Sequence, residues 1–232
     1  MMTELRKSTR VRVLEFLIHC AHELEVSPMV KYSALSLFAE RFYPSISGLL
    51  ENKATEHWLL HPMTEGNLQL FALSALWISS KMHDSPPLSV KHCKNLANKY
   101  IREQHFTLRD LLESVSEFRI GTLNIAFVFL EELLVQLREV AQVGEHVRLE
   151  TCMDIFDLLY EEEEKMILYN SPFSLAASLL VVAYVVTVPK RKWEFPILPW
   201  VKFVTGCKEE DILTCVEDIL KHVVCNVNMT ST

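Results

Sequence analysis

Apolar residues recur at intervals of three and four along most of the 232-residue chain, the spacing that places side chains on one face of an α-helix. The first such stripe predicts a helix and consists of Val13, Phe16, Leu17, Cys20 and Leu24. Ser27 and Pro28 follow, where a serine oxygen can cap free N–H groups and proline fits the first helical position. A second helix is therefore expected over residues 30–42, ending before Pro44.

Two stretches, residues 67–82 and 174–188, are apolar on nearly all sides rather than along one stripe. A helix without a polar face needs other helices around it, so both are predicted at the centres of helical bundles. The run 173–188 is too short to span a bilayer comfortably, and its interspersed hydroxyl side chains favour a buried helix. We therefore expect no association with a membrane.

Turn signals divide the chain into two halves of similar architecture. The first half continues with a fourth helix after the break at residues 84–87 and a fifth from about residue 107. Residues 121–122, Gly-Thr, interrupt the pattern, and further helices are then expected over 123–140, 149–162, 174–188, around Trp200 and over 209–224. The sequence thus predicts an all-α protein with two tandem five-helix folds, 1–120 and 121–232, each burying its third helix.

Composition narrows the classes of function. Only 5 residues are glycine, whereas sheet and nucleotide-binding folds use glycine in turns and phosphate loops. The net charge of -7 argues against a protein held to nucleic acid mainly by phosphate contacts. The 6 cysteines show neither CxxC nor zinc-site spacing, which suits reduced thiols in the cytosol or nucleus. The polar N-terminus does not resemble a signal peptide.

No set of residues in the sequence points to catalysis, a cofactor or a metal ion. Nucleotide-binding, nucleophile and zinc-protease motifs do not occur in it. His19 and His22 are three residues apart but lack a carboxylate or thiolate partner for a metal. The acidic run 161–164 is interpreted as a solvated helix end. Lys81 ends an apolar helix, where its stem can follow the core while its ammonium reaches the rim.

One stretch, Leu68–Val90, resembles the middle of a cyclin box. It opens with LQL and continues to Ser80 and Lys81, then to an acid and Pro-Pro at residues 86–87, as in cyclins. Upstream, residues 10–17 resemble the MRAIL segment of cyclins and the residues that follow it. Two shorter segments match the end of the second helix and the start of the second cyclin fold, residues 40–42 and 171–173. The chain is identified as a member of the cyclin family, closest to the short plant cyclins of the J type.

The resemblance implies a regulatory subunit that binds and activates a cyclin-dependent protein kinase, and not an enzyme. A cyclin packs its first fold against a mobile helix and the activation loop of the kinase, which favours the active arrangement. The family's lysine falls on Lys81, whose implied role is hydrogen bonding to the kinase backbone. Its substrate-docking groove falls on Arg10, Val13, Phe16 and Gln69. The family also implies a location in the nucleus, the cytoplasm or both.

The chain departs from the family pattern at several places. Phe16 stands for the tryptophan of the groove, and Asp84 is the one acid left of the pair that follows the lysine. Arg12 replaces the isoleucine of MRAIL and His19 replaces an acidic residue, which weakens the expectation that basic, leucine-containing substrates dock here. Between residues 106 and 118 the chain is about half a dozen residues shorter than the family pattern, more than one helical turn. Glu113 and Glu117 are the nearest candidates for the family's kinase-contacting glutamate, although neither is in register. We therefore expect impaired kinase binding.

Two other interpretations remain open from the sequence. One is a helical adaptor that binds no kinase, and the other is a paired cyclin-fold module of the transcription-factor or retinoblastoma kind. The negative net charge argues against a DNA-binding version of the second. The Ser-Lys and Pro-Pro pairs favour a cyclin.

Overall fold

The structure is a computed structural model and describes residues 2–44, 46, 64–101, 125–161, 171–192 and 194–229. Every regular element within these residues is a helix, which confirms the all-α prediction. The chain divides into two compact units, the first unit Met1–Leu123 and the second unit Asn124–Thr232. The expected boundary at residues 120–121 and the expected fifth helix from residue 107 lie outside the described residues.

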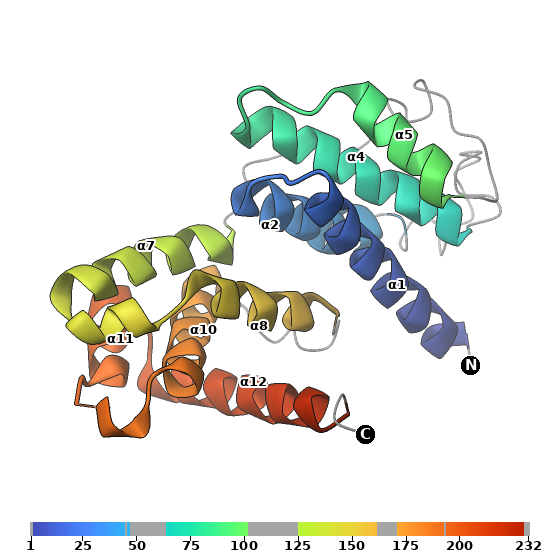
Figure 1. The fold of residues 1–232 in the computed structure, drawn as a ribbon. Helices are drawn as coiled ribbons and strands as arrows, with labels where there is room; N and C mark the ends of the chain where they lie inside the picture. Colours follow the sequence, from blue (N-terminus) through green and yellow to red (C-terminus); the bar gives the residue numbers. More distant parts are fainter. Residues whose placement is uncertain are drawn as a thin grey trace. The chain divides into compact units, whose positions relative to one another are not determined.

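The described part of the first unit is built around one central helix (Figure 1). Its helices are α1 (Met2–Glu23), α2 (Pro28–Ser36), the π-helical segment η1 (Leu37–Phe42) that continues α2, α4 (Glu65–His83) and α5 (Val90–Tyr100). Helix α4 contacts all the others. Its residues from Gly66 to Ser80 are buried, except for the half-buried Gln69, so the predicted burial of this helix on nearly all sides is confirmed.

Helix α2 begins as its sequence predicts and then widens in a way that the sequence did not predict. The Ser27 hydroxyl accepts a hydrogen bond from the N–H of Val30 at 3.3 Å, and Pro28 occupies the first turn. The buried residues of the π-helical segment η1 are Leu37, Phe38, Ala39 and Phe42. Such a run of neighbouring buried positions covers a wider arc than an α-helical stripe, and spacing by three and four cannot reveal it.

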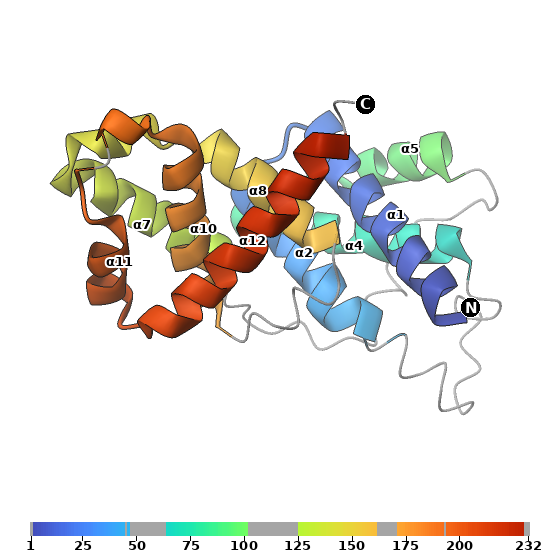
Figure 2. The same cartoon turned by 90° about the horizontal axis from the view of Figure 1, so that it is seen from below.

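The second unit also surrounds one buried helix (Figure 2). Its helices are α7 (Ala126–Val140), η3 (Gln142–His146), α8 (Leu149–Glu161), α10 (Pro172–Thr187), η4 (Lys190–Lys192), α11 (Ile197–Thr205) and α12 (Glu209–Met229). Helix α10 contacts α7, α8, α11 and α12, and every residue from Leu175 to Tyr184 is buried. This confirms the prediction for the second apolar stretch.

Among the helix starts that differ from the prediction, those of α7 and α10 have a visible cause. Helix α7 begins at Ala126 rather than Leu123, because Ile125 is extended, with φ −94° and ψ 125°. Helix α10 begins at Pro172 rather than Ser174, because the Ser171 hydroxyl accepts from the N–H of Ser174 at 3.4 Å. The Ser-Pro signal that opens α2 therefore also opens α10.

The described residues hold buried thiols rather than a metal centre. No group of three or more His, Cys, Asp or Glu side chains among them could hold a metal ion, and no helix among them is long and apolar enough to cross a membrane. Cys20, Cys93 and Cys152 are free and buried. Burial raises the pKa of each of these thiols to about 12, so they stay protonated at neutral pH.

The C-terminal end of α4 is fixed by side chains that bond across the following loop. The Ser80 hydroxyl is fully buried and accepts a hydrogen bond from the N–H of Leu88 at 2.6 Å, which ties the Pro-Pro segment back to the helix. The Ser27 hydroxyl donates to Oδ1 of Asp84 at 2.9 Å, so the cap of α2 also holds the residue that ends α4. These bonds set the position of the last turn of α4, which carries Lys81.

Replacement of Ser80 by alanine tests this role. The N–H of Leu88 would lose its partner in a part-buried site, so Ser80→Ala should lower the free energy of unfolding by about 1–3 kcal/mol. Urea unfolding followed by circular dichroism measures the loss. The matched control is Asn98→Ala on the exposed side of α5, which should change stability by less than about 0.5 kcal/mol. Equal stability of the two variants would contradict this account of the loop.

Candidate functional site

The side chain of Lys81 emerges at the end of the central helix α4. The ammonium nitrogen lies 3.9 Å from the centroid of the Trp77 ring, one helical turn earlier. The ring itself is only 6% exposed, whereas the lysine is exposed. A cation over the face of an indole is attracted by the ring's quadrupole, and the helix C-terminus also favours positive charge. The lysine is therefore held against the core edge with its ammonium turned to the surface.

The ammonium of Lys81 has no carboxylate partner among the described residues. Its three N–H donors can therefore bond to carbonyl or carboxylate oxygens of another molecule without first breaking an ion pair with a described carboxylate. Glu113 and Glu117, the candidates for a glutamate beside this lysine, lie outside the described residues. The described part of the candidate site thus consists of Lys81, the Trp77 ring beneath it and the loop held by Ser80.

The predicted substrate-docking patch is only partly at the surface. Arg10 is 2% exposed, with its guanidinium carbon 5.8 Å from the centroid of the Tyr43 ring, and Val13 is fully buried. Phe16 and Gln69 are half-buried. Arg10 and Val13 therefore belong to the packed interior of the first unit and cannot touch a docked peptide in this structure. Of the four predicted residues, Phe16 and Gln69 alone offer surface to a partner.

A polar bridge between α1 and α4 lies beside the remaining patch. Nε of Arg12 donates to Oε2 of Glu65 at 2.8 Å, and another guanidinium nitrogen donates to the hydroxyl of Ser8 at 2.8 Å. Both partners of the ion pair are substantially exposed, so the pair contributes little to stability. The pair changes the chemistry of this surface, because a charged side chain occupies the position at which the family pattern has an isoleucine.

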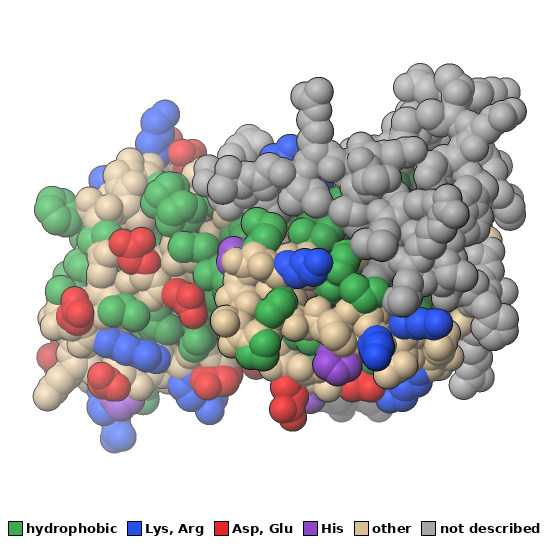
Figure 3. All heavy atoms as spheres, turned by 90° about the horizontal axis from the view of Figure 1, so that it is seen from above, with side chains coloured by type: hydrophobic (Ala, Val, Ile, Leu, Met, Phe, Trp, Pro, Cys, Tyr) green, Lys and Arg blue, Asp and Glu red, His purple; other side chains and the backbone are tan. Residues whose placement is uncertain are grey.

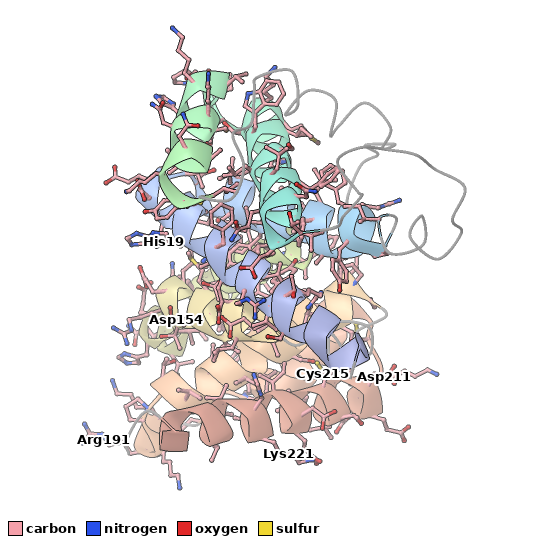
Figure 4. The ribbon with its side chains drawn as sticks, turned by 90° about the vertical axis from the view of Figure 1, so that its right-hand side faces the viewer. His19, Asp154, Arg191, Asp211, Cys215 and Lys221 are labelled. Atoms are coloured by element: carbon pink, nitrogen blue, oxygen red, sulfur yellow. The ribbon has the colours of Figure 1, made fainter. Side chains whose placement is uncertain are left out.

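A second polar group, the α1–α5 cluster, flanks Phe16 on the other side. It joins His19 and Glu23 of α1 to Lys99 and Tyr100 of α5 (Figure 4 labels His19). The Tyr100 hydroxyl donates to the Glu23 carboxylate, and Nζ of Lys99 donates to that carboxylate at 2.8 Å. These two hydrogen bonds hold the pKa of Glu23 below its usual range.

The hydrogen bonds of the α1–α5 cluster also indicate which ring nitrogen of His19 carries a proton. Nε2 of His19 lies 2.9 Å from the Tyr100 oxygen. Because that hydroxyl gives its hydrogen to Glu23, the imidazole must be the donor, and Nε2 carries a proton. His19 is thus a hydrogen-bond donor within a tyrosine–glutamate cluster. Phe16 packs edge-on against the Tyr100 ring, with 6.2 Å between the centroids.

Sequence reasoning missed the partners of the α1–α5 cluster. Lys99 and Tyr100 lie more than 70 positions from Glu23, and no local spacing links them. The Trp77 ring under Lys81 could have been found, because the two residues are four apart on one helix face.

Comparisons with known proteins identify the family of the chain. Residues 1–120 match the cyclin N-terminal domain. Cyclin-J18 of Arabidopsis thaliana is 52% identical over 230 residues, covering 97% of this chain and 98% of its own. Cyclin-J18-like of Oryza sativa subsp. japonica is 49% identical over 229 residues, covering 94% and 88%.

A solved structure supports the fold. The viral cyclin of herpesvirus saimiri superposes with a TM-score of 0.63, covering 94% of this chain and 85% of its own. At 16% sequence identity this likeness speaks for the fold alone. With the domain match over half of the chain and two plant relatives over nearly all of it, the chain belongs to the cyclin family and, within it, to the plant J type.

Proposed function

We propose that this chain binds a cyclin-dependent protein kinase through its first unit and stabilises the active arrangement of that kinase. The observation that carries the proposal is Lys81, an exposed cation held over Trp77 at the end of a buried helix. Because α4 is packed on nearly all sides, this ammonium is presented by a rigid support, and little conformational entropy is lost when it bonds to a partner.

The mechanism we propose is a shift of population in the kinase. A partner that binds one of two kinase conformations more tightly moves the equilibrium toward it without any chemistry of its own. Lys81 would donate to backbone carbonyl oxygens of the kinase, since an ammonium offers three donors and no acceptor. Cyclins are regulatory proteins, and the chain is accordingly proposed to act as a subunit, located in the nucleus, the cytoplasm or both.

Substrate recruitment through the first unit is proposed to be weak. With Arg10 and Val13 buried, the patch is reduced to Phe16 and Gln69. Arg12, four residues before Phe16 on the same helix, is paired with Glu65, so this position offers a basic docking segment neither apolar contact nor a free carboxylate. Basic, leucine-containing substrates should therefore gain little from this surface.

The short segment between residues 106 and 118 bears on how tightly the kinase is held. We propose that this segment, which is shorter than the family pattern, weakens kinase binding. The adaptor interpretation, in which no kinase is bound, is the alternative that the experiments below distinguish.

Charge reversal at Lys81 tests the kinase contact. Lys81→Glu should lower recovery of a plant cyclin-dependent kinase from dividing-cell extract by about tenfold or more, because a carboxylate would face the carbonyl oxygens that the ammonium is proposed to bind. Co-precipitation with the tagged full chain measures this, and thermal unfolding checks that the variant folds. Lys208→Glu, an exposed reversal in the second unit, should leave recovery unchanged. Equal recovery with both variants would argue for the adaptor.

Lengthening the short segment tests its effect on affinity. A chimera in which residues 106–118 are lengthened by about six residues to the length of the family pattern should recover about tenfold more kinase, since a restored helical turn adds both core packing and contact surface. The same co-precipitation measures it, with Lys81→Glu introduced into the chimera as the control. Equal recovery by the chimera and the natural chain would show that the shortening does not impair binding.

A further inference from the structure

Helix α7 of the second unit carries two exposed valines on its outer face. Val128 is 39% exposed and Val135 is 54% exposed. The two residues are seven apart, which places them on the same side of the helix, two turns from each other. On the face of the protein in Figure 3, hydrophobic side chains likewise lie among charged ones. Glu131 and Glu132 lie between the valines on this side of the helix, so the exposed strip of α7 alternates aliphatic and acidic side chains.

A groove runs along this strip, and we call it the α7 groove. It has a volume of about 510 Å³ and is formed by α7 together with the first residue of α8. Its lining includes Val128, Val135 and Leu149 together with the charged residues Glu131, Glu132 and Arg138. Two helical turns extend about 11 Å along the axis, which matches two turns of a bound helix or three to four residues of an extended segment.

Two carboxylates stand among these apolar groups. Glu131 is half-buried and Glu132 is exposed, and neither forms an ion pair with a cation among the described residues. Burial raises the pKa of Glu131, since no described cation offsets the loss of water around its carboxylate. Within the part of the chain that the structure describes, Glu132 accepts one hydrogen bond, from Nε2 of Gln136 at 3.4 Å. A half-buried carboxylate without a counter-ion is a favourable site for a cation from another molecule.

The basic residue at the end of the groove does not neutralise these acids. Nη2 of Arg138 donates to the carbonyl oxygen of Val147 at 3.0 Å, so its guanidinium is directed toward the turn that follows η3. The α7 groove therefore combines exposed aliphatic surface with negative charge. A partner that complements both features needs aliphatic side chains to cover the valines and a lysine or arginine to meet Glu131.

We propose that the α7 groove binds a short segment of a partner protein that presents leucine- or valine-like side chains beside a lysine or arginine. The proposal is independent of the kinase-binding function, because the groove lies in the second unit and its binding is measured without a kinase. The first unit, with its Arg12 and His19, is poorly suited to bind basic segments. The proposal gives this docking role to the second unit.

The test uses the full chain and a fluorescein-labelled peptide of 12 residues with alternating leucine and lysine as the probe. Fluorescence anisotropy gives its affinity for the natural chain, for Val135→Ser and for the double variant Glu131→Gln, Glu132→Gln. We expect the charge variant to bind about tenfold more weakly and the valine variant about fivefold more weakly. A second probe, with glutamate in place of lysine, should not bind detectably.

Matched substitutions away from the groove serve as controls. Val186→Ser on α10 removes a valine that is 51% exposed, close to the 54% of Val135, and Glu217→Gln neutralises an exposed acid on α12. Both should keep the affinity within about twofold of the natural chain. Unchanged affinity in the groove variants, or equal binding of the two probes, would overturn the proposal. So would sedimentation showing a dimer that does not bind the lysine probe, because a second copy would then occupy the groove.

Discussion

Burial of the apolar helix α4 on nearly all of its sides decides how the first unit can make contact with other molecules. Because its residues from Gly66 to Ser80 are packed against α1, α2, η1 and α5, the first long polar side chain that reaches the surface at its end is Lys81. The same packing supports the Trp77 ring on which the ammonium rests. The strongly apolar sequence thus serves two purposes: it forms the core, and it sets the position of one charge at the core's edge.

The surface beside this core shows how a family can keep its fold while its contacts change. At two positions of α1 where the family pattern has an isoleucine and an acidic residue, this chain has Arg12, paired with Glu65, and His19, bonded to Tyr100. Each replacement is made by polar residues at exposed positions, where substitution costs little stability. The core stripe of α1 is retained, with Val13 fully buried, so recognition can diverge without loss of the bundle.

Much of the fold could be predicted because the signals are local. The Ser-Pro starts of α2 and α10 and the absence of a polar face on α4 and α10 depend on neighbouring residues, and the structure contains them. The burial of Arg10 and the α1–α5 cluster depend on residues that are distant in the sequence, and spacing along one chain carries no record of those contacts. Lys81 could be predicted as a candidate contact residue because its family position and its place at a helix end agree.

The central claim is that the end of α4 and the loop that follows it form the contact with a kinase. Hydrogen exchange of the purified chain, with and without a saturating amount of purified plant cyclin-dependent kinase, tests this claim most directly. The account predicts slower exchange on kinase binding in the segment 81–90, where Lys81 and the loop tied by Ser80 lie. Unchanged exchange in that segment, or protection confined to the second unit, would contradict it.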